Sequence, residues 1–320
     1  MVSVAVETDA PVSPVTPVLD LLRCPETGGP LVAVTAGLAG PGGHIYPFTP
    51  SGVPLFASAS ASADARRQET HYNAVASAYE ANLRYPHTRA YLVHLDQAVL
   101  DAFGARRVGT VAEICCGTGE AFTLLAGRYD RGIGVDISPV MLDRAVTAHR
   151  GEPVAFVQGD ATRLPLADAA FDAVVMLGGI HHVSDRAALF SEIVRILRPG
   201  GRFIYREPVS DLAIWRWLRA VIYRISPMLD PESERPLTWA ETVPVLARTG
   251  FEIESWKTYG FFGFCLFMNS DVLVFNRLFR LIPGIAAIAR TAARFDDWML
   301  RLPGLAGAGL QVVGVARKPR

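Results

Sequence analysis

The chain has 320 residues, enough for one large α/β domain with an appended module or for two modest domains. Lysine plus arginine and aspartate plus glutamate both number 31, so no net charge draws the protein to phosphates, and nucleic acid is excluded as a main partner. Half of the residues are hydrophobic, which predicts a large apolar pocket, a buried contact such as a homodimer interface, or a surface that faces a membrane.

The four cysteines show no disulfide framework, and this predicts a reducing, cytoplasmic compartment. Residues 1–17 carry Glu7 and Asp9 and lack a basic start, so no secretory signal is expected. The longest apolar run, 260–268, is far shorter than the roughly 20 residues that span a bilayer. We expect a cytoplasmic protein, with peripheral membrane contact as an alternative.

The amino-terminal part divides by composition. Residues 1–17 alternate Val with Pro, Ser and Thr and are expected to form a disordered arm. Residues 18–56 hold short apolar pieces between Gly and Pro, which predicts a small β-rich module. The Ala and Ser residues that open 57–69 indicate a linker or the frayed start of a helix, and 70–320 is predicted to be the main domain.

Strand-like and helical runs alternate between residues 108 and 207, which predicts a doubly wound, Rossmann-like α/β fold. Two later strand-like runs, 251–260 and 310–318, complete a mostly parallel seven-stranded sheet. Insertions 209–236 and 261–306 follow strands, so we expect them to overhang the carboxyl edge of the sheet as a helical cap.

A ligand site is expected at this edge, because open α/β sheets bind ligands beyond the carboxyl ends of their strands. Gly117 and Gly119 follow the first strand and allow a ligand to approach the backbone closely. Asp136 ends the next strand, where a carboxylate can accept both ribose hydroxyl hydrogens. Phe122 stands where a dinucleotide fingerprint has its third glycine, so a nucleoside without pyrophosphate fits better than NAD.

The third strand is followed by Asp160 and Ala161. A carboxylate there can accept a hydrogen bond from an exocyclic adenine amine, while the small neighbour leaves room for the ring. Between residues 114 and 203 the chain contains, in order, the motifs ICCGTGE, GVDISPVMLDRA, VQGDATRLPLADAAFDAVVMLGGIHHVSD and ILRPGGRF. They resemble the successive motifs of class I S-adenosylmethionine-dependent methyltransferases of the ubiquinone and menaquinone biosynthesis type.

The resemblance covers about 70–207 closely and implies S-adenosylmethionine as cofactor, with S-adenosylhomocysteine as product. It implies that Glu113 lies near the methionine amino group, Asp136 at the ribose and Asp160 at the adenine. Other candidate contacts are the tyrosines that family members often fold over the cofactor and residues beside the motifs: Tyr72, Tyr79, Cys115, Gly117, Gly119, Ile137, Met141, Ala161 and Leu177.

Cys115 departs from the resembled pattern, because the family usually has glycine at that position. Either the loop is slightly wider there or the backbone keeps a negative φ. No cluster of His or Cys lies near Cys115 and Cys116, so they are expected to pack in the loop and core and no metal is predicted.

Methyl transfer from a sulfonium mainly needs alignment and exclusion of water, so a catalytic base is optional. If one is used, the candidates are His181, His182 and Glu207, at the carboxyl ends of the fourth and fifth strands. The alternative is that one imidazole only holds the following loop by a backbone hydrogen bond.

Aromatic residues are frequent in the two insertions, which favours a lipophilic acceptor such as a secondary metabolite or a quinone-like or lipid precursor. Packing between cap helices is the alternative explanation. Arginines interleave with Trp and Ile in segment 211–225, which also suits an interfacial helix. A different functional class stays open: a cofactor-binding protein of this fold that acts as a cyclase, an isomerase or a regulatory module.

The motifs LLRCPETGGPL and IYPFTPSGVPLF resemble the zinc-ribbon-like, Trm112-like module that precedes some methyltransferase domains. In that module the first knuckle reads CPxC, but here Thr27 replaces the second cysteine. Only Cys24 and His44 remain as potential ligands, so the zinc is predicted to be lost. What remains is expected to be a structural hairpin or a dimerisation piece.

Overall fold

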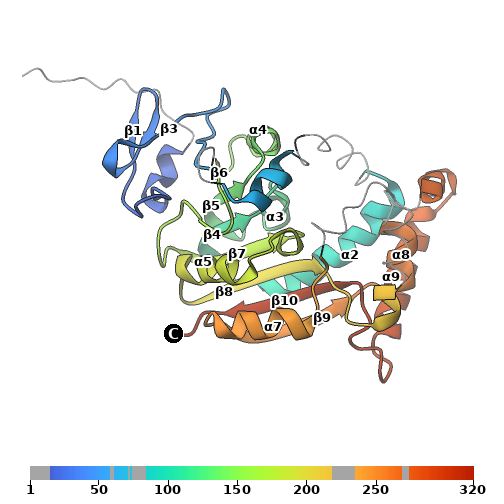
Figure 1. Cartoon of the computed structure of the whole chain (residues 1–320). Coiled ribbons are helices and arrows are strands. Elements are labelled where there is room, and N and C mark those ends of the chain that lie inside the picture. The colour runs from blue at the N-terminus through green and yellow to red at the C-terminus, as the bar shows by residue number, and fades with distance from the viewer. Residues whose placement is uncertain (1–14, 58–60, 71–72, 74–83, 218–234, 269–273) are drawn as a thin grey trace, which may run out of the picture.

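A computed structural model describes residues 15–57, 61–70, 73, 84–217, 235–268 and 274–320 (Figure 1). Its centre is a seven-stranded sheet in the order β6-β5-β4-β7-β8-β10-β9, in which β10 is antiparallel to both neighbours. The strands are β4 (Val108–Ile114), β5 (Tyr129–Asp136), β6 (Val154–Gln158), β7 (Phe171–Leu177), β8 (Leu197–Pro208), β9 (Glu252–Tyr259) and β10 (Gln311–Arg317). The predicted mostly parallel, doubly wound sheet is confirmed.

Helices cover both faces of this sheet, because its central strands are apolar on both sides. Most of the buried residues of α2 (Pro86–Phe103), α3 (Glu120–Leu124) and α4 (Pro139–Ala148) belong to the core of one face. Those of α5 (Arg186–Ile196) and α7 (Trp239–Arg248) belong to the core of the other. Because β4, β5, β6, β7 and β8 pair in parallel, their carboxyl ends lie at one common edge of the sheet.

Insertion 261–306 forms the helices α8 (Phe262–Met268), η4 (Val274–Leu281) and α9 (Ile285–Met299). They pack on α2 and stand beyond the carboxyl ends of β7 and β8 (Figure 1). Asp296 of α9 is fully buried and accepts hydrogen bonds from three backbone N–H groups at the start of α8 and from the Tyr91 hydroxyl of α2. One carboxylate thus ties three helices together.

The amino-terminal module starts with η1 (Thr16–Leu21) and has an antiparallel sheet of β1 (Val32–Val34), β2 (Gly37–Ala39) and β3 (Ile45–Tyr46), with η2 (Pro41–Gly43) between the last two. Its core holds Cys24, whose Sγ lies 3.1 Å from the Tyr46 hydroxyl, whereas His44 is exposed. Across the described ranges, no three His, Cys, Asp or Glu side chains are grouped so that they can hold a metal ion.

The module docks against the free edge of β6. Leu55 pairs in parallel with Gln158, whose N–H donates to the Pro54 carbonyl at 2.9 Å. Arg131 of β5 forms an ion pair with Asp20 at 2.9 Å. This docking brings residues 61–70, which are helical from 63, over the carboxyl edge of the sheet. No helix in the described part of the chain is long and apolar enough to cross a membrane.

Candidate functional site

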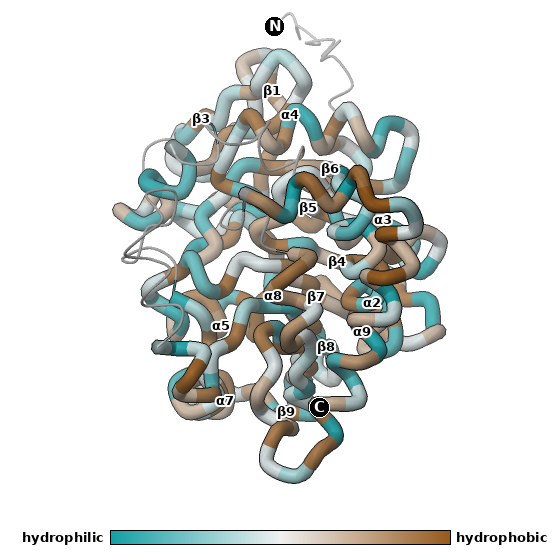
Figure 2. The backbone as a smooth tube through the Cα atoms, turned by 90° about the vertical axis from the view of Figure 1, so that its right-hand side faces the viewer, coloured by the Kyte–Doolittle hydropathy of each residue, from teal (hydrophilic) through white to brown (hydrophobic). Residues whose placement is uncertain are grey.

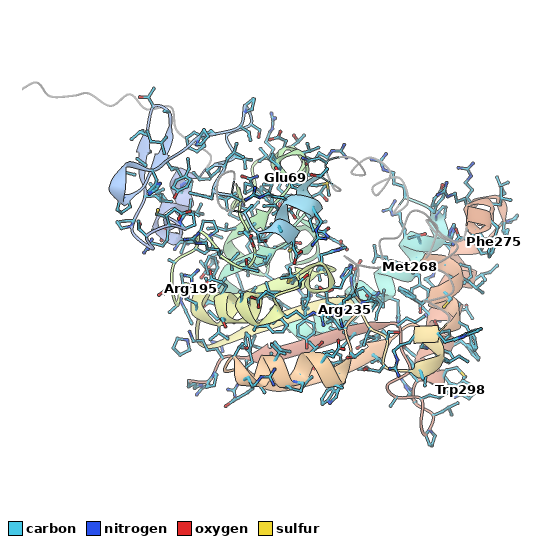
Figure 3. All side chains as sticks on the ribbon, in the orientation of Figure 1. Glu69, Arg195, Arg235, Met268, Phe275 and Trp298 are labelled. Atoms are coloured by element: carbon cyan, nitrogen blue, oxygen red, sulfur yellow. The ribbon has the colours of Figure 1, made fainter. Side chains whose placement is uncertain are left out.

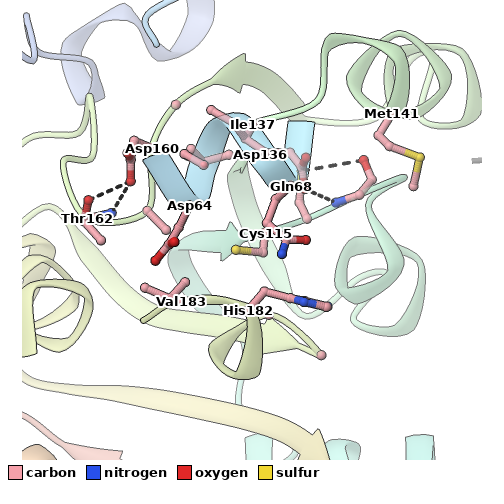
Figure 4. A pocket seen from close by; sticks show the side chains of 18 of the residues that line it. Asp64, Gln68, Cys115, Asp136, Ile137, Met141, Asp160, Thr162, His182 and Val183 are labelled. Carbon is pink, nitrogen blue, oxygen red and sulfur yellow. Dashed lines mark hydrogen bonds between the residues drawn. The ribbon is translucent and has the colours of Figure 1, made fainter. Parts of the chain in front are cut away.

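A pocket of about 280 Å³ opens at the carboxyl edge, where β4, β5, β6 and β7 end (Figure 4). Nine of the candidate cofactor contacts line it together: Glu113, Cys115, Gly117, Asp136, Ile137, Met141, Asp160, Ala161 and Leu177. Gly119 is not among the lining residues, and Tyr72 and Tyr79 lie outside the described residues. None of the described residues of the two insertions lines this pocket.

Glu113 lies one residue before the end of β4 and is almost fully buried. Its Oε1 accepts a hydrogen bond from the Ala121 N–H at 2.8 Å, but Oε2 has no hydrogen-bond partner although it is buried. Burial raises the pKa of Glu113 well above its ordinary value, against the effect of the backbone hydrogen bonds. An unpartnered buried carboxylate oxygen in a pocket wall is suited to a cationic or hydrogen-bonding ligand group.

Asp136 ends β5 and joins two loops of the pocket. Its two oxygens accept hydrogen bonds from the Gly117 N–H at 2.8 Å and the Ser138 N–H at 2.9 Å. Burial raises the pKa of Asp136, while these backbone donors act in the opposite direction. Each carboxylate oxygen has a further lone pair, so both can still accept from a ligand.

Asp160 follows β6 and sits in a more polar environment than the other two acids. It accepts from the Ser62 N–H, the Thr162 N–H and the Thr162 hydroxyl at 2.7–2.8 Å. Burial opposes ionisation, but these donors prevail and lower the pKa of Asp160. Three adjacent strands therefore bring one acidic side chain each to the same pocket.

The loop after β4 is left-handed at three positions, with φ of 53° at Cys115, 50° at Gly117 and 84° at Gly119. The alternative that the backbone keeps a negative φ at Cys115 is therefore wrong. A Cβ on Gly119 would lie 2.6 Å from His149 Nε2, so the close turn requires glycine there. Phe122 is fully buried and packs against Gly132 of β5, where a Cβ would clash with its ring.

One wall of the pocket was not predicted from the sequence. Ser62, Asp64, Ala65 and Gln68 line it from the segment predicted to be a linker. Gln68 Oε1 is buried without a hydrogen-bond partner, as is the Oε2 atom of Glu113. The sequence signal for this wall is weak, because its Ala and Ser residues show no apolar periodicity.

The three candidate bases occupy different positions. His182 lines the pocket, but His181 and Glu207 are not among its lining residues. Glu207 is fully buried and accepts from the Gly179 and Ile180 N–H groups at 2.7 and 2.8 Å, and its Oε2 lies 2.8 Å from His181 Nδ1. Glu207 therefore fixes the turn η3 (Ile180–His182), on which His182 stands.

Residues 112–205 match the family model of a methyltransferase domain. This region of the chain is therefore similar to methyltransferase domains. The match begins in β4 and ends in β8, so the matched residues supply most of the pocket described above.

The names of curated relatives of this region point to different acceptors. A demethylmenaquinone methyltransferase of Beutenbergia cavernae is 44% identical over 111 residues, which cover 35% of this chain and 45% of the relative. A ubiquinone/menaquinone biosynthesis C-methyltransferase of Brucella anthropi is 27% identical, covering 59% and 81%. A fatty-acid O-methyltransferase of Mycolicibacterium smegmatis is 33% identical, covering 41% and 47%. The chain thus spans less than half the length of the first and third relatives.

Solved structures share the fold of this chain. A SAM-dependent methyltransferase from Thermotoga maritima has a TM-score of 0.52 at 21% identity and covers 79% of this chain and 99% of its own. A chain from a complex of the Haloferax volcanii Trm112 methyltransferase activator with a protein described as a methyltransferase has a TM-score of 0.52 at 17% identity, covering 79% and 97%. At these identities the likeness concerns the fold alone.

Proposed function

We propose that this protein is an S-adenosylmethionine-dependent methyltransferase that transfers a methyl group to an O, C or N atom of a lipophilic small molecule. The observation that carries the proposal is the meeting of Glu113, Asp136 and Asp160 in one pocket at the ends of adjacent strands. The match of residues 112–205 to a methyltransferase domain supports the same function.

The pocket residues fit the three parts of this cofactor. Glu113 would receive the methionine ammonium on its unpartnered Oε2, and Asp136 would accept from both ribose hydroxyls. Asp160 would accept from the adenine amine, with Ala161 beside the ring. Gln68 adds a second unpartnered acceptor to the wall. When bound, the cofactor supplies an electrophilic methyl group on a positively charged sulfur.

The chain's contribution to transfer is alignment and exclusion of water. Ile137, Met141 and Leu177 supply apolar contacts in the pocket. His182 is our candidate for the group that orients the acceptor or takes its proton, because it lines the pocket. We assign His181 and Glu207 a positioning role, since they hold the turn that carries His182.

The acceptor is proposed to be a quinone-like, lipid or other lipophilic molecule. Support comes from the apolar part of the pocket wall and from the acceptors named for the relatives, which include menaquinone precursors and fatty acids. We further propose that insertions 209–236 and 261–306 cover the acceptor, and that residues 18–56 are a structural module that positions the wall containing Gln68.

Incubation of the whole protein with methyl-labelled S-adenosylmethionine and a panel of lipophilic phenols, quinols, carboxylic acids and amines tests the proposal. We expect label in at least one acceptor, with formation of S-adenosylhomocysteine. Label in no acceptor, together with saturable cofactor binding, would instead favour the cyclase, isomerase or regulatory alternative. Failure to bind the cofactor would contradict the proposal itself.

A further inference from the structure

η4 presents a row of large apolar side chains to solvent. A 3₁₀-helix has three residues per turn, so residues three apart lie on one side of it. Phe275, Leu278 and Leu281 have this spacing, and their exposed fractions are 53%, 61% and 71%. Asn276 is fully buried and donates to a backbone carbonyl of α8. η4 is therefore anchored by one side and exposes apolar residues on another.

α9 continues this pattern. Its buried side is formed by Ile285, Ala289, Ala293 and Asp296. Ile288, Phe295 and Trp298 share a different side and are about half exposed, with the rings of Phe295 and Trp298 5.6 Å apart. Figure 3 shows Phe275 and Trp298 on the same side of the molecule, the side that faces the viewer in Figure 2. The outer surface is defined by Phe275, Leu278, Leu281, Ile288, Phe295 and Trp298.

Exposed arginines lie on the same helices as the outer surface. Arg290 and Arg294 lie one turn apart on α9 and are exposed, and Arg280 on η4 and Arg301 after α9 are exposed too. The two acidic residues in 274–306 are Asp296, which is buried, and Asp297, which is half-buried and lies 3.1 Å from His94. In this part of a chain with balanced charges, these arginines are exposed while the two acidic side chains are buried or half-buried.

We infer that the outer surface docks onto an anionic lipid bilayer, with η4 and α9 lying along it. Helices with large apolar side chains on one side and arginines next to them lie in the interface of anionic membranes. A contact between two copies is disfavoured, because a two-fold interface pairs this surface with itself and the exposed charged side chains of η4 and α9 are all arginines. No described helix can span the bilayer, which is consistent with peripheral docking.

Co-sedimentation of the whole protein with vesicles tests this inference without cofactor or acceptor. One set of vesicles is phosphatidylcholine, and the other contains about one third phosphatidylglycerol. We expect binding to the anionic vesicles that weakens with added salt. The double substitution Leu278→Ser and Leu281→Ser should reduce the partition coefficient about tenfold or more. Because both side chains are mostly exposed, this variant should fold normally.

The matched control is Val32→Ser with Ile45→Ser, which removes two exposed apolar side chains from the amino-terminal sheet. This variant should bind vesicles as the unchanged protein does. Replacement of Arg290 and Arg294 by Gln should reduce binding to anionic vesicles without changing oligomeric state in sedimentation velocity. No vesicle binding, equal loss in the control, or a dimer that Leu278→Ser and Leu281→Ser dissociate would overturn the inference. Because vesicle binding is measured without cofactor or acceptor, its result does not depend on whether the protein is a methyltransferase.

Discussion

At the scale of single residues, Glu113 is expected to lower the stability of the fold at neutral pH and to strengthen cofactor binding. Its carboxyl group is buried, and one oxygen has no hydrogen-bond partner. The folded protein therefore holds the Glu113 proton more tightly than the unfolded chain does. In the cofactor-free protein, Glu113 contributes fully to the free energy of unfolding below its ordinary pKa of 4.5. This contribution is lost as the pH rises through the raised pKa of the folded protein.

Replacement of Glu113 by glutamine removes the unfavourable burial of a charged carboxylate and keeps an oxygen that accepts from the Ala121 N–H. We expect Glu113→Gln to raise Tm at neutral pH by about 2–4 °C and to weaken cofactor binding about tenfold or more. Calorimetric scans and titrations at several pH values measure both effects. A lower Tm with unchanged cofactor affinity would show that Glu113 is only a structural residue.

The two neighbouring histidines are expected to differ. His182→Gln should lower kcat about 10²-fold and leave the cofactor Kd unchanged, because His182 lines the pocket and is not among the residues that we assign to the cofactor. His181→Gln should mainly lower Tm, because His181 contacts the buried Glu207. Steady-state kinetics and thermal unfolding of both variants separate these roles. Equal kinetics of His182→Gln and the unchanged enzyme would exclude His182 as the base.

At the scale of elements, Asp296 holds α8, α9 and α2 together through four accepted hydrogen bonds. Asparagine has one acceptor oxygen and turns an NH₂ group toward donors. Asp296→Asn should therefore lower the free energy of unfolding by about 2–4 kcal/mol in urea titrations. Asp297→Asn, at a half-buried residue with one contact to His94, is the control and should cost less than about 1 kcal/mol. Similar losses in both variants would refute the anchoring role of Asp296.

The elements also show what sequence patterns can predict. All seven strands of the main sheet were predicted, because buried apolar runs and the glycine or acid that follows them are local signals. The wall at Ser62 and Gln68 was not predicted as part of the pocket. Its position depends on the hydrogen bond from the Ser62 N–H to Asp160, almost a hundred residues away along the chain. The φ of Cys115 was likewise undetermined, because only the folded loop fixes it.

At the scale of the whole molecule, the two surfaces to which we assign functions belong to different parts of the fold. The main pocket lies where β4, β5 and β6 end, with the amino-terminal module docked at the β6 edge. The outer surface lies on α9 and η4, on the side of α2. Sequence composition placed the apolar excess in the two insertions, as lining for a lipophilic acceptor or as packing between cap helices. In the structure, part of it in η4 and α9 is exposed to solvent instead, because exposure depends on which helix faces pack inward.

The central claim is that the main pocket binds S-adenosylmethionine through Asp136. Isothermal titration calorimetry of the cofactor into the unchanged protein and into Asp136→Asn tests it most directly. We predict one site per chain in the unchanged protein, with affinity reduced at least about tenfold in the variant, whose secondary structure by circular dichroism should be unaltered. No binding to the unchanged protein, or equal affinity in a folded Asp136→Asn variant, would contradict the account.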